Sequence, residues 1–183
     1  MASTYNVLIC SPAGFLQQQR LCLSVDPADG SSLIVAARDP DSTLQHWIVM
    51  DLGNSNFAFW NDPLHVLVAD MDTGALSLRY KPAGPYAPYA TDEFWNGALN
   101  QSLADFIKNA FVQFGQGIAG LFSGATHIHW PGVAMRPNFD YNRNLNILGD
   151  GPWAPGRRVA AWDGWGGGDP NELWWLEARP LTP

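Results

Sequence analysis

The feature that most constrains the fold is a short motif that occurs three times: a carboxamide or carboxylate, any residue, then tryptophan. The copies are Gln45-His46-Trp47, Glu93-Phe94-Trp95 and Glu172-Leu173-Trp174. The first two tryptophans lie 48 positions apart and the last two lie 79 apart, an excess of 31 that is close to the length of one differently composed segment, 98–129. Without that segment the chain divides into three units of similar length, a period typical of repeat architectures.

Each unit also contains two short apolar strands that are joined by a turn with glycine. The first strand of each unit ends in aspartate, and these strands cover 21–26, 65–70 and 145–150. The second strands cover 33–37, 76–80 and 159–162. Short strands at this spacing predict an all-β sandwich or barrel, and the threefold repeat favours a pseudo-threefold barrel. We expect the three repeated tryptophans to fill its shared core.

The segment 98–129 has a different periodicity. Its apolar residues recur at helical spacing along one face, and glycines at 115 and 117 end the pattern: Leu103, Phe106, Ile107, Ala110, Phe111 and Phe114. This pattern predicts an α-helical insertion. The helix either covers the barrel or docks a protein partner, and the sequence leaves both open.

Charge and composition exclude several classes of protein. The chain has 183 residues, 46% of them hydrophobic, which fits a single folded domain. It has 10 basic and 17 acidic side chains, a net charge of -7, and no basic cluster larger than Arg157-Arg158. We therefore expect no nucleic-acid partner. No stretch of 18 apolar residues occurs, so we expect no membrane span.

The two cysteines give an expectation about the cellular compartment. Cys10 and Cys22 lie in apolar stretches; they could pair, but we interpret them as small buried hydrophobic residues. With no secretory signal at the start of the sequence, we expect a cytoplasmic or nucleocytoplasmic protein.

The repeated motifs and their flanking residues resemble the ricin-B-like β-trefoil lectins, and within that group the plant Euonymus-type lectin domain. The resemblance covers residues 4–97 and 130–179 and excludes the insertion. It rests on Leu44-Gln45-His46-Trp47, Phe57-Ala58-Phe59-Trp60-Asn61, Phe94-Trp95, Asn144-Leu145-Asn146 and the tail 161–174. It implies a β-trefoil of three repeats (about 4–53, 54–97 and 130–179) with the helical insertion between the second and third. It also implies a nucleocytoplasmic, defence-related lectin that binds glycans or glycoproteins without a cofactor or catalysis.

In such lectins a polar residue at a strand end, an aromatic on the next strand and an asparagine before the repeated motif form a shallow sugar site. In the third unit these positions correspond to Asn146 or Asp150, then Trp162 with Trp165, then Asn171, and Glu172 stands where the family usually has glutamine. The residues themselves favour the same region, because an indole stacks on a sugar ring while carboxylates and amides bind its hydroxyls. Asp163 joins the candidate site on this argument.

The other two units have weaker candidates. The first unit has Arg38 in place of Trp162 and Leu44 in place of Asn171, so we expect no site there. The second unit offers a variant site of Asp70, Tyr80 and Asp92.

An alternative function uses the same scaffold as a protein-binding or protease-inhibitor-like defence protein. Its working surface would be the segment 98–129 together with the Pro/Tyr-rich loop 81–89, whose tyrosines at 86 and 89 we expect to be exposed. Catalysis is less well supported, because Asp163 and Asp169 lie in a shallow hairpin that would not desolvate an acid. The pair His127 and His129 has metal-ligand spacing, but no third ligand is evident, so we expect no metal site.

Overall fold

The computed structural model describes residues 4–54, 56–97, 132–164 and 169–178. These residues form twelve β-strands and four short 3-10 helices, and they contain no α-helix. The all-β prediction is confirmed for this part of the chain. The predicted α-helix falls on 98–129, which lies outside the described residues. Among the described residues, no helix has the length and apolar character needed to cross a bilayer.

Six strands close into an antiparallel barrel. The barrel strands, in order around the ring, are β1 (Thr4–Ser11), β4 (Trp47–Gly53), β5 (Asn56–Asp62), β8 (Trp95–Gly97), β9 (Val133–Pro137) and β12 (Leu173–Ala178). Each strand pairs with the next, and β12 pairs with β1, which closes the ring. Each unit contributes its first and last strand to the barrel. Closure leaves the barrel no free sheet edge.

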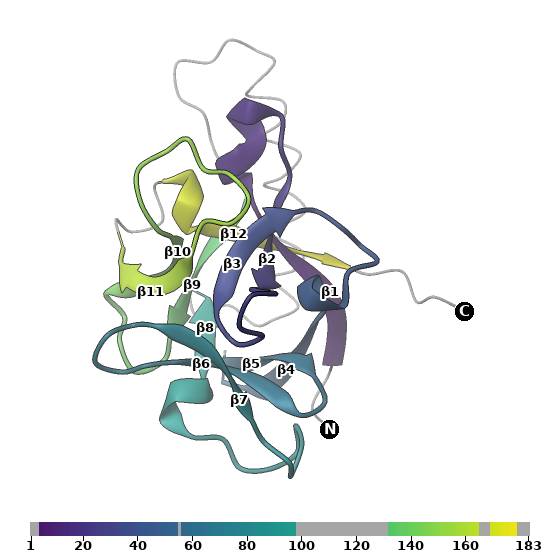
Figure 1. Cartoon of the computed structure of the whole chain (residues 1–183). Helices are drawn as coiled ribbons and strands as arrows, with labels where there is room; N and C mark the ends of the chain where they lie inside the picture. Colours follow the sequence, from purple (N-terminus) through teal and green to yellow (C-terminus); the bar gives the residue numbers. More distant parts are fainter. Residues whose placement is uncertain (1–3, 55, 98–131, 165–168, 179–183) are drawn as a thin grey trace.

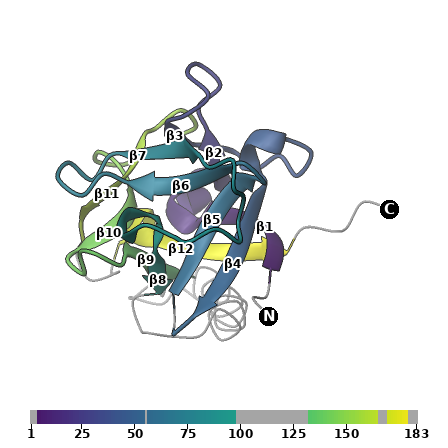
Figure 2. The ribbon, with the colours of Figure 1, turned by 90° about the horizontal axis from the view of Figure 1, so that it is seen from below.

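The six remaining strands form three hairpins, one from each unit. They are β2–β3 (Leu21–Val25 and Leu33–Ala37), β6–β7 (His65–Ala69 and Leu76–Tyr80) and β10–β11 (Arg143–Ile147 and Val159–Asp163). Single bridges link each hairpin to the other two: Ser32 to Ser77, Ile34 to Arg158 and Ala75 to Ala160. The hairpins lie in different sectors of the molecule (Figure 1), and Figure 2 shows β6–β7 and β10–β11 beside the barrel strands. The three predicted hairpins and the pseudo-threefold arrangement are confirmed, but the strand predicted at 145–150 lies at Arg143–Ile147 and does not reach Asp150.

The three repeated tryptophans fill one core, as predicted. Trp47, Trp95 and Trp174 are all fully buried and belong to the same hydrophobic cluster. Trp47 donates from Nε1 to the carbonyl of Leu23 at 3.1 Å, and Trp174 donates to the carbonyl of Leu145 at 2.8 Å. The Nε1 of Trp95 has no hydrogen-bond partner within the described part of the chain. The three units therefore share a buried tryptophan but differ in whether its indole N–H has a hydrogen-bond acceptor.

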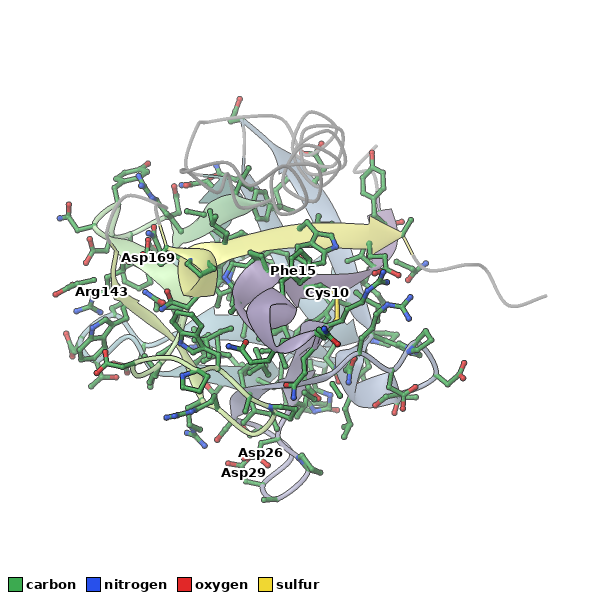
Figure 3. The ribbon with its side chains drawn as sticks, turned by 90° about the horizontal axis from the view of Figure 1, so that it is seen from above. Cys10, Phe15, Asp26, Asp29, Arg143 and Asp169 are labelled. Atoms are coloured by element: carbon green, nitrogen blue, oxygen red, sulfur yellow. A yellow bond between two sulfur atoms is a disulfide. The ribbon has the colours of Figure 1, made fainter. Side chains whose placement is uncertain are left out.

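The interpretation of the cysteines as separate hydrophobic residues is wrong. Cys10 of β1 and Cys22 of β2 form a disulfide, because the antiparallel register places them directly opposite one another. The bond is fully buried beside Trp175 and next to the short helix η1 (Pro12–Gln17) with Phe15; Figure 3 shows Cys10 and Phe15 together there. Because disulfides are rare in reducing compartments, this pairing removes one argument for the cytoplasmic expectation.

The segment 98–129 lies between two neighbouring strands of the barrel. It connects β8 to β9, two strands that pair directly, with Gly97 opposite Met135. Asn96 in turn lies opposite Asn56, at the β4–β5 turn. The last described residue before the segment, Gly97, therefore lies at the end of the barrel where that turn lies.

Candidate functional site

An exposed tryptophan and a long hairpin turn define a cavity in the third unit. Trp162 lies on β11 and is 56% exposed, whereas Trp47, Trp95 and Trp174 are buried. The turn between β10 and β11 runs from 148 to 158 and is longer than the equivalent turns 26–32 and 70–75. This cavity has a volume of about 370 Å³, and its lining residues are Asn146, Ile147, Leu148, Gly149, Asp150, Trp162 and Asn171.

A chain of side-chain amides fixes the polar wall of the cavity. Asn171 donates from Nδ2 to Oδ1 of Asn146 at 2.6 Å and to the carbonyl of Ile147 at 3.1 Å. Asn146 in turn donates to Oε1 of Glu172 at 3.5 Å, and Asn144 donates to Oε2 of the same carboxyl at 3.2 Å. Because Asn171 uses its amide hydrogens internally, its Oδ1 remains as an acceptor for a ligand.

Glu172 is the residue that sets the direction of these bonds. It lies in the short helix η4 (Pro170–Glu172) and is fully buried, so it stands behind Asn146 rather than at the surface. Both of its oxygens accept from amides, which turns the NH₂ group of Asn146 inward and its oxygen toward Asn171. Arg136 extends the chain by donating from Nε to Oδ1 of Asn144 at 2.9 Å. Glu172 therefore supports the cavity indirectly.

Close packing explains the glycine at position 164, directly after β11. A Cβ at Gly164 would lie 2.0 Å from Nδ2 of Asn144, which is too close for any side chain. The backbone N–H of Gly164 also donates to the carbonyl of Asn142 at 2.9 Å. Glycine at this position lets the chain pass directly over the amide network.

The residues predicted for the sugar site divide into four groups. Asn146, Asp150, Trp162 and Asn171 line the cavity described above. Asp163 lies on the other side of Trp162, in a second cavity. Glu172 is buried behind the first cavity. Trp165 lies outside the described residues.

The strand register corrects the alignment of the units. Leu23, Leu67 and Leu145 are equivalent, because each lies two residues before the end of its hairpin strand and two of them accept the indole hydrogen bond. Counting from them, Ala36 and Arg79 occupy the place of Trp162, rather than Arg38 and Tyr80. By the same register, Leu148 is the equivalent of Asp26 and Asp70, and its N–H bonds across the hairpin as theirs do. Asp150 comes two residues later, in the long turn.

The three residues of the second predicted site do not form an open cluster. Asp70 and Tyr80 lie at opposite ends of the β6–β7 hairpin, where Tyr80 pairs with His65. Asp70 accepts from Oγ1 and the N–H of Thr73, both at 2.7 Å, and these bonds hold the pKa of its carboxyl below the usual 3.8. Asp92 forms a two-bond ion pair with Arg79, the residue in the position of Trp162.

In the second unit, ion pairs occupy the polar side chains that correspond to the cavity wall of the third unit. Arg79 also approaches Glu93 at 3.5 Å, and Lys81 pairs with Glu93 from the other side. The position equivalent to Asn171 is thus taken by an engaged carboxylate. The first unit has Ala36 in place of the indole and has neither a ring nor an amide, so it presents no comparable site.

The structure also corrects the description of the loop 81–89. Tyr86 is 83% exposed, but Tyr89 is partly buried: its hydroxyl donates to the carbonyl of Pro85 at 2.6 Å and accepts from Nε1 of Trp60 at 3.0 Å. Burial raises the pKa of Tyr89 to about 12. The ammonium of Lys81 lies 4.3 Å from the centre of the Tyr89 ring. Only one of the two tyrosines is presented to solvent.

No group of three histidine, cysteine or acidic residues is placed to hold a metal ion among the residues that the structure describes. His127 and His129 lie outside those residues.

Sequence comparison matches no family model and no curated protein, but the structure resembles several solved structures. One is a mosquitocidal holotoxin, with a TM-score of 0.65 and 12% identity over 99% of this chain and 17% of that chain. The ricin B-like lectin of Macrolepiota procera, solved with lactose, gives 0.58 and 15% over 94% of each chain. The C-half of the earthworm R-type lectin, solved with GalNAc, gives 0.53 and 13% over 95% and 98%. These similarities show a β-trefoil fold, which two lectins among the similar structures share. The Euonymus-type relationship stays a prediction.

Proposed function

We propose that this chain is a non-catalytic carbohydrate-binding protein whose third unit holds the glycan against Trp162. The observation that carries the proposal is the pairing of an exposed indole with a preformed polar wall in one cavity. The apolar C–H face of a sugar ring stacks on an indole, while its hydroxyls need acceptors and donors in fixed positions. Oδ1 of Asn171 and the carboxylate of Asp150 supply acceptors beside the ring.

The described residues of the other two units form no equivalent site, which limits the expected affinity. A single shallow cavity with one aromatic surface supports monovalent binding of millimolar to micromolar strength, or about -4 to -8 kcal/mol. Tighter attachment to a cell surface or glycoprotein would then require several copies of the chain on one target.

Binding without turnover is part of the same proposal. The carboxylates next to Trp162, Asp150 and Asp163, are both exposed. A glycosidase needs one carboxyl that stays protonated near neutral pH, and desolvation usually provides that condition. Exposed side chains lack that desolvation.

A glycan array followed by calorimetry tests the proposal. Trp162→Ala should weaken binding of the best array ligand at least tenfold, because the stacking surface is removed. Tyr86→Ala is the matched control, since it also removes an exposed aromatic ring but lies in the second unit. Both variants should unfold at the wild-type temperature. The proposal fails if no glycan binds, or if Trp162→Ala binds as tightly as wild type.

One observation favours the alternative of a protein-binding surface. Tyr86 is the most exposed large hydrophobic residue among those described, and Tyr89 and Lys81 hold the loop that presents it. An anchored loop with an exposed tyrosine is a common feature of protein interfaces. Retention of a defined protein partner by wild type and Trp162→Ala, but not by Tyr86→Ala, would support this function over glycan binding.

A further inference from the structure

Trp162 borders two cavities. The first is the cavity of about 370 Å³ with Asn146, Asp150 and Asn171. The second has a volume of about 230 Å³, and its lining residues are Asp72, Thr73, Arg143, Ala161, Trp162 and Asp163. The exposed indole therefore forms part of the wall of both.

The second cavity is built by two units that are distant in sequence. The turn 70–74 of the second unit packs against β11 of the third, where the N–H of Ala161 donates to the carbonyl of Gly74 at 2.8 Å. Arg143 fastens the same turn by donating to the carbonyl of Met71 at 3.3 Å and to that of Asp72 at 3.0 Å. Figure 3 shows Arg143 on the same side of the molecule as Asp169, which directly precedes η4. These contacts fix the cavity before any ligand arrives.

The polar groups of the second cavity favour neutral ligands. The guanidinium of Arg143 is engaged by two carbonyls and by the carboxylate of Asp140, whose Oδ2 lies 3.3 Å from Nε. The carboxylates of Asp72 and Asp163 make no hydrogen bond or ion pair within the described part of the chain, and both are exposed. They can accept hydroxyl hydrogens, while their charge repels a carboxylate or sulfate.

We propose that Trp162 is shared by two adjacent subsites, and that the preferred ligand is a neutral oligosaccharide with one residue in each cavity. This inference rests on the proposed function and adds the length and charge of the ligand to it. The first subsite binds one sugar through Asn171 and Asp150. The second binds the neighbouring sugar through Asp72 and Asp163.

The test compares ligand length in variants of the second cavity. The probes are an array of neutral and of sialylated or uronic-acid glycans of one to four residues, followed by calorimetry with the best monosaccharide and its neutral extensions. Wild type should bind a neutral disaccharide or trisaccharide at least fivefold more tightly than the monosaccharide. It should bind an extension that ends in an acidic sugar more weakly than the neutral one.

Asp163→Ala and Asp72→Ala should remove most of the gain from ligand length and leave the monosaccharide affinity within twofold of wild type. Neither side chain has an internal partner to lose, so both variants should fold. Equal affinities of wild type for mono- and oligosaccharide, or an unchanged gain in both variants, would overturn the two-subsite proposal alone. Binding of no glycan of any length would overturn the proposed function as well.

Discussion

Asn171 donates to Oδ1 of Asn146 over 2.6 Å, and this bond joins the helix η4 to the strand β10 beneath the cavity. It is possible in this direction because the NH₂ group of Asn146 is already turned toward Glu172. The buried carboxylate of Glu172 thus determines that Asn171 presents an oxygen to the cavity.

Replacement of this acid by its amide tests the network. Glu172→Gln places a new NH₂ group against the donating amides of Asn144 or Asn146, so one buried donor loses its acceptor. We expect the free energy of unfolding to fall by roughly 1–3 kcal/mol, and glycan affinity to fall with it. Denaturant unfolding and calorimetry measure the two effects.

The first unit offers the reciprocal control. Gln45 donates to the carbonyl of Ala37 at 2.8 Å, so Gln45→Glu should also destabilise the fold while leaving the affinity of the folded protein for glycan unchanged. A Glu172→Gln variant as stable as wild type and with equal glycan affinity would contradict the role of Glu172 in orienting the amides.

The tryptophans of the core should differ in their tolerance to phenylalanine. Trp174→Phe leaves the buried carbonyl of Leu145 without its donor, whereas Trp95→Phe removes an indole N–H that has no partner among the described residues. Both lose similar apolar area, so Trp174→Phe should be more destabilising by roughly 1–3 kcal/mol. Thermal or urea unfolding of the two variants gives this difference. Equal losses would contradict the difference in indole hydrogen bonding between these two positions.

The disulfide should contribute substantially to stability. It closes a loop with a sequence separation of 12 residues, for which chain-entropy arguments give about 3 kcal/mol. The double variant Cys10→Ala, Cys22→Ala should lose about that amount in denaturant unfolding. Dithiothreitol should lower the midpoint of wild type and leave the midpoint of the double variant unchanged. A midpoint of wild type that is insensitive to full reduction would contradict this prediction.

Two equivalent glycines should respond differently to alanine. Gly30 and Gly74 both have positive φ, of 66° and 73°, so each substitution costs about 1–2 kcal/mol in the backbone alone. A Cβ at Gly30 meets nothing within 4 Å, but at Gly74 it would lie 2.0 Å from the carbonyl oxygen of Ala161. Gly74→Ala should therefore cost roughly 1–3 kcal/mol more, measured by urea unfolding.

The same two glycine variants distinguish a loss of the second subsite from a general loss of stability. Gly74→Ala displaces the turn 70–74 from β11, so it should also reduce the gain in affinity from a second sugar, whereas Gly30→Ala should preserve that gain. Equal unfolding free energies of the two variants would contradict the close packing of these hairpins.

Local pattern was sufficient to predict the repeated elements of the fold. The spacing of Trp47, Trp95 and Trp174 and the alternating strands predict the barrel, because both depend on neighbours within one unit. Residue identity alone places the equivalents of Trp162 at Arg38 and Tyr80, but the strand register places them at Ala36 and Arg79. The difference is two residues in the first unit and one in the second, and a slip of one residue reverses the face of a strand. The interpretation of Cys10 and Cys22 as separate residues is wrong for a related reason, since only the register of β1 with β2 places them opposite one another.

Contacts between units could not be predicted from the sequence. Asp72 and Asp163 are 91 positions apart and line one cavity only because the turn 70–74 packs against β11. The sequence gives no periodic signal for this contact, although the positive-φ glycine at 74 marks the turn. The departure from glutamine at Glu172 is visible in the sequence, but its hydrogen bonds with Asn144 and Asn146 of β10 are not.

The most direct measurement of the central claim is the resonance of the Trp162 indole N–H in a ¹H–¹⁵N spectrum, assigned through Trp162→Phe and followed as glycan is added. The account predicts a saturable shift of this signal, with the dissociation constant found by calorimetry, while the buried indoles of Trp47 and Trp174 stay unchanged. A glycan that binds with no change at the Trp162 signal would contradict it.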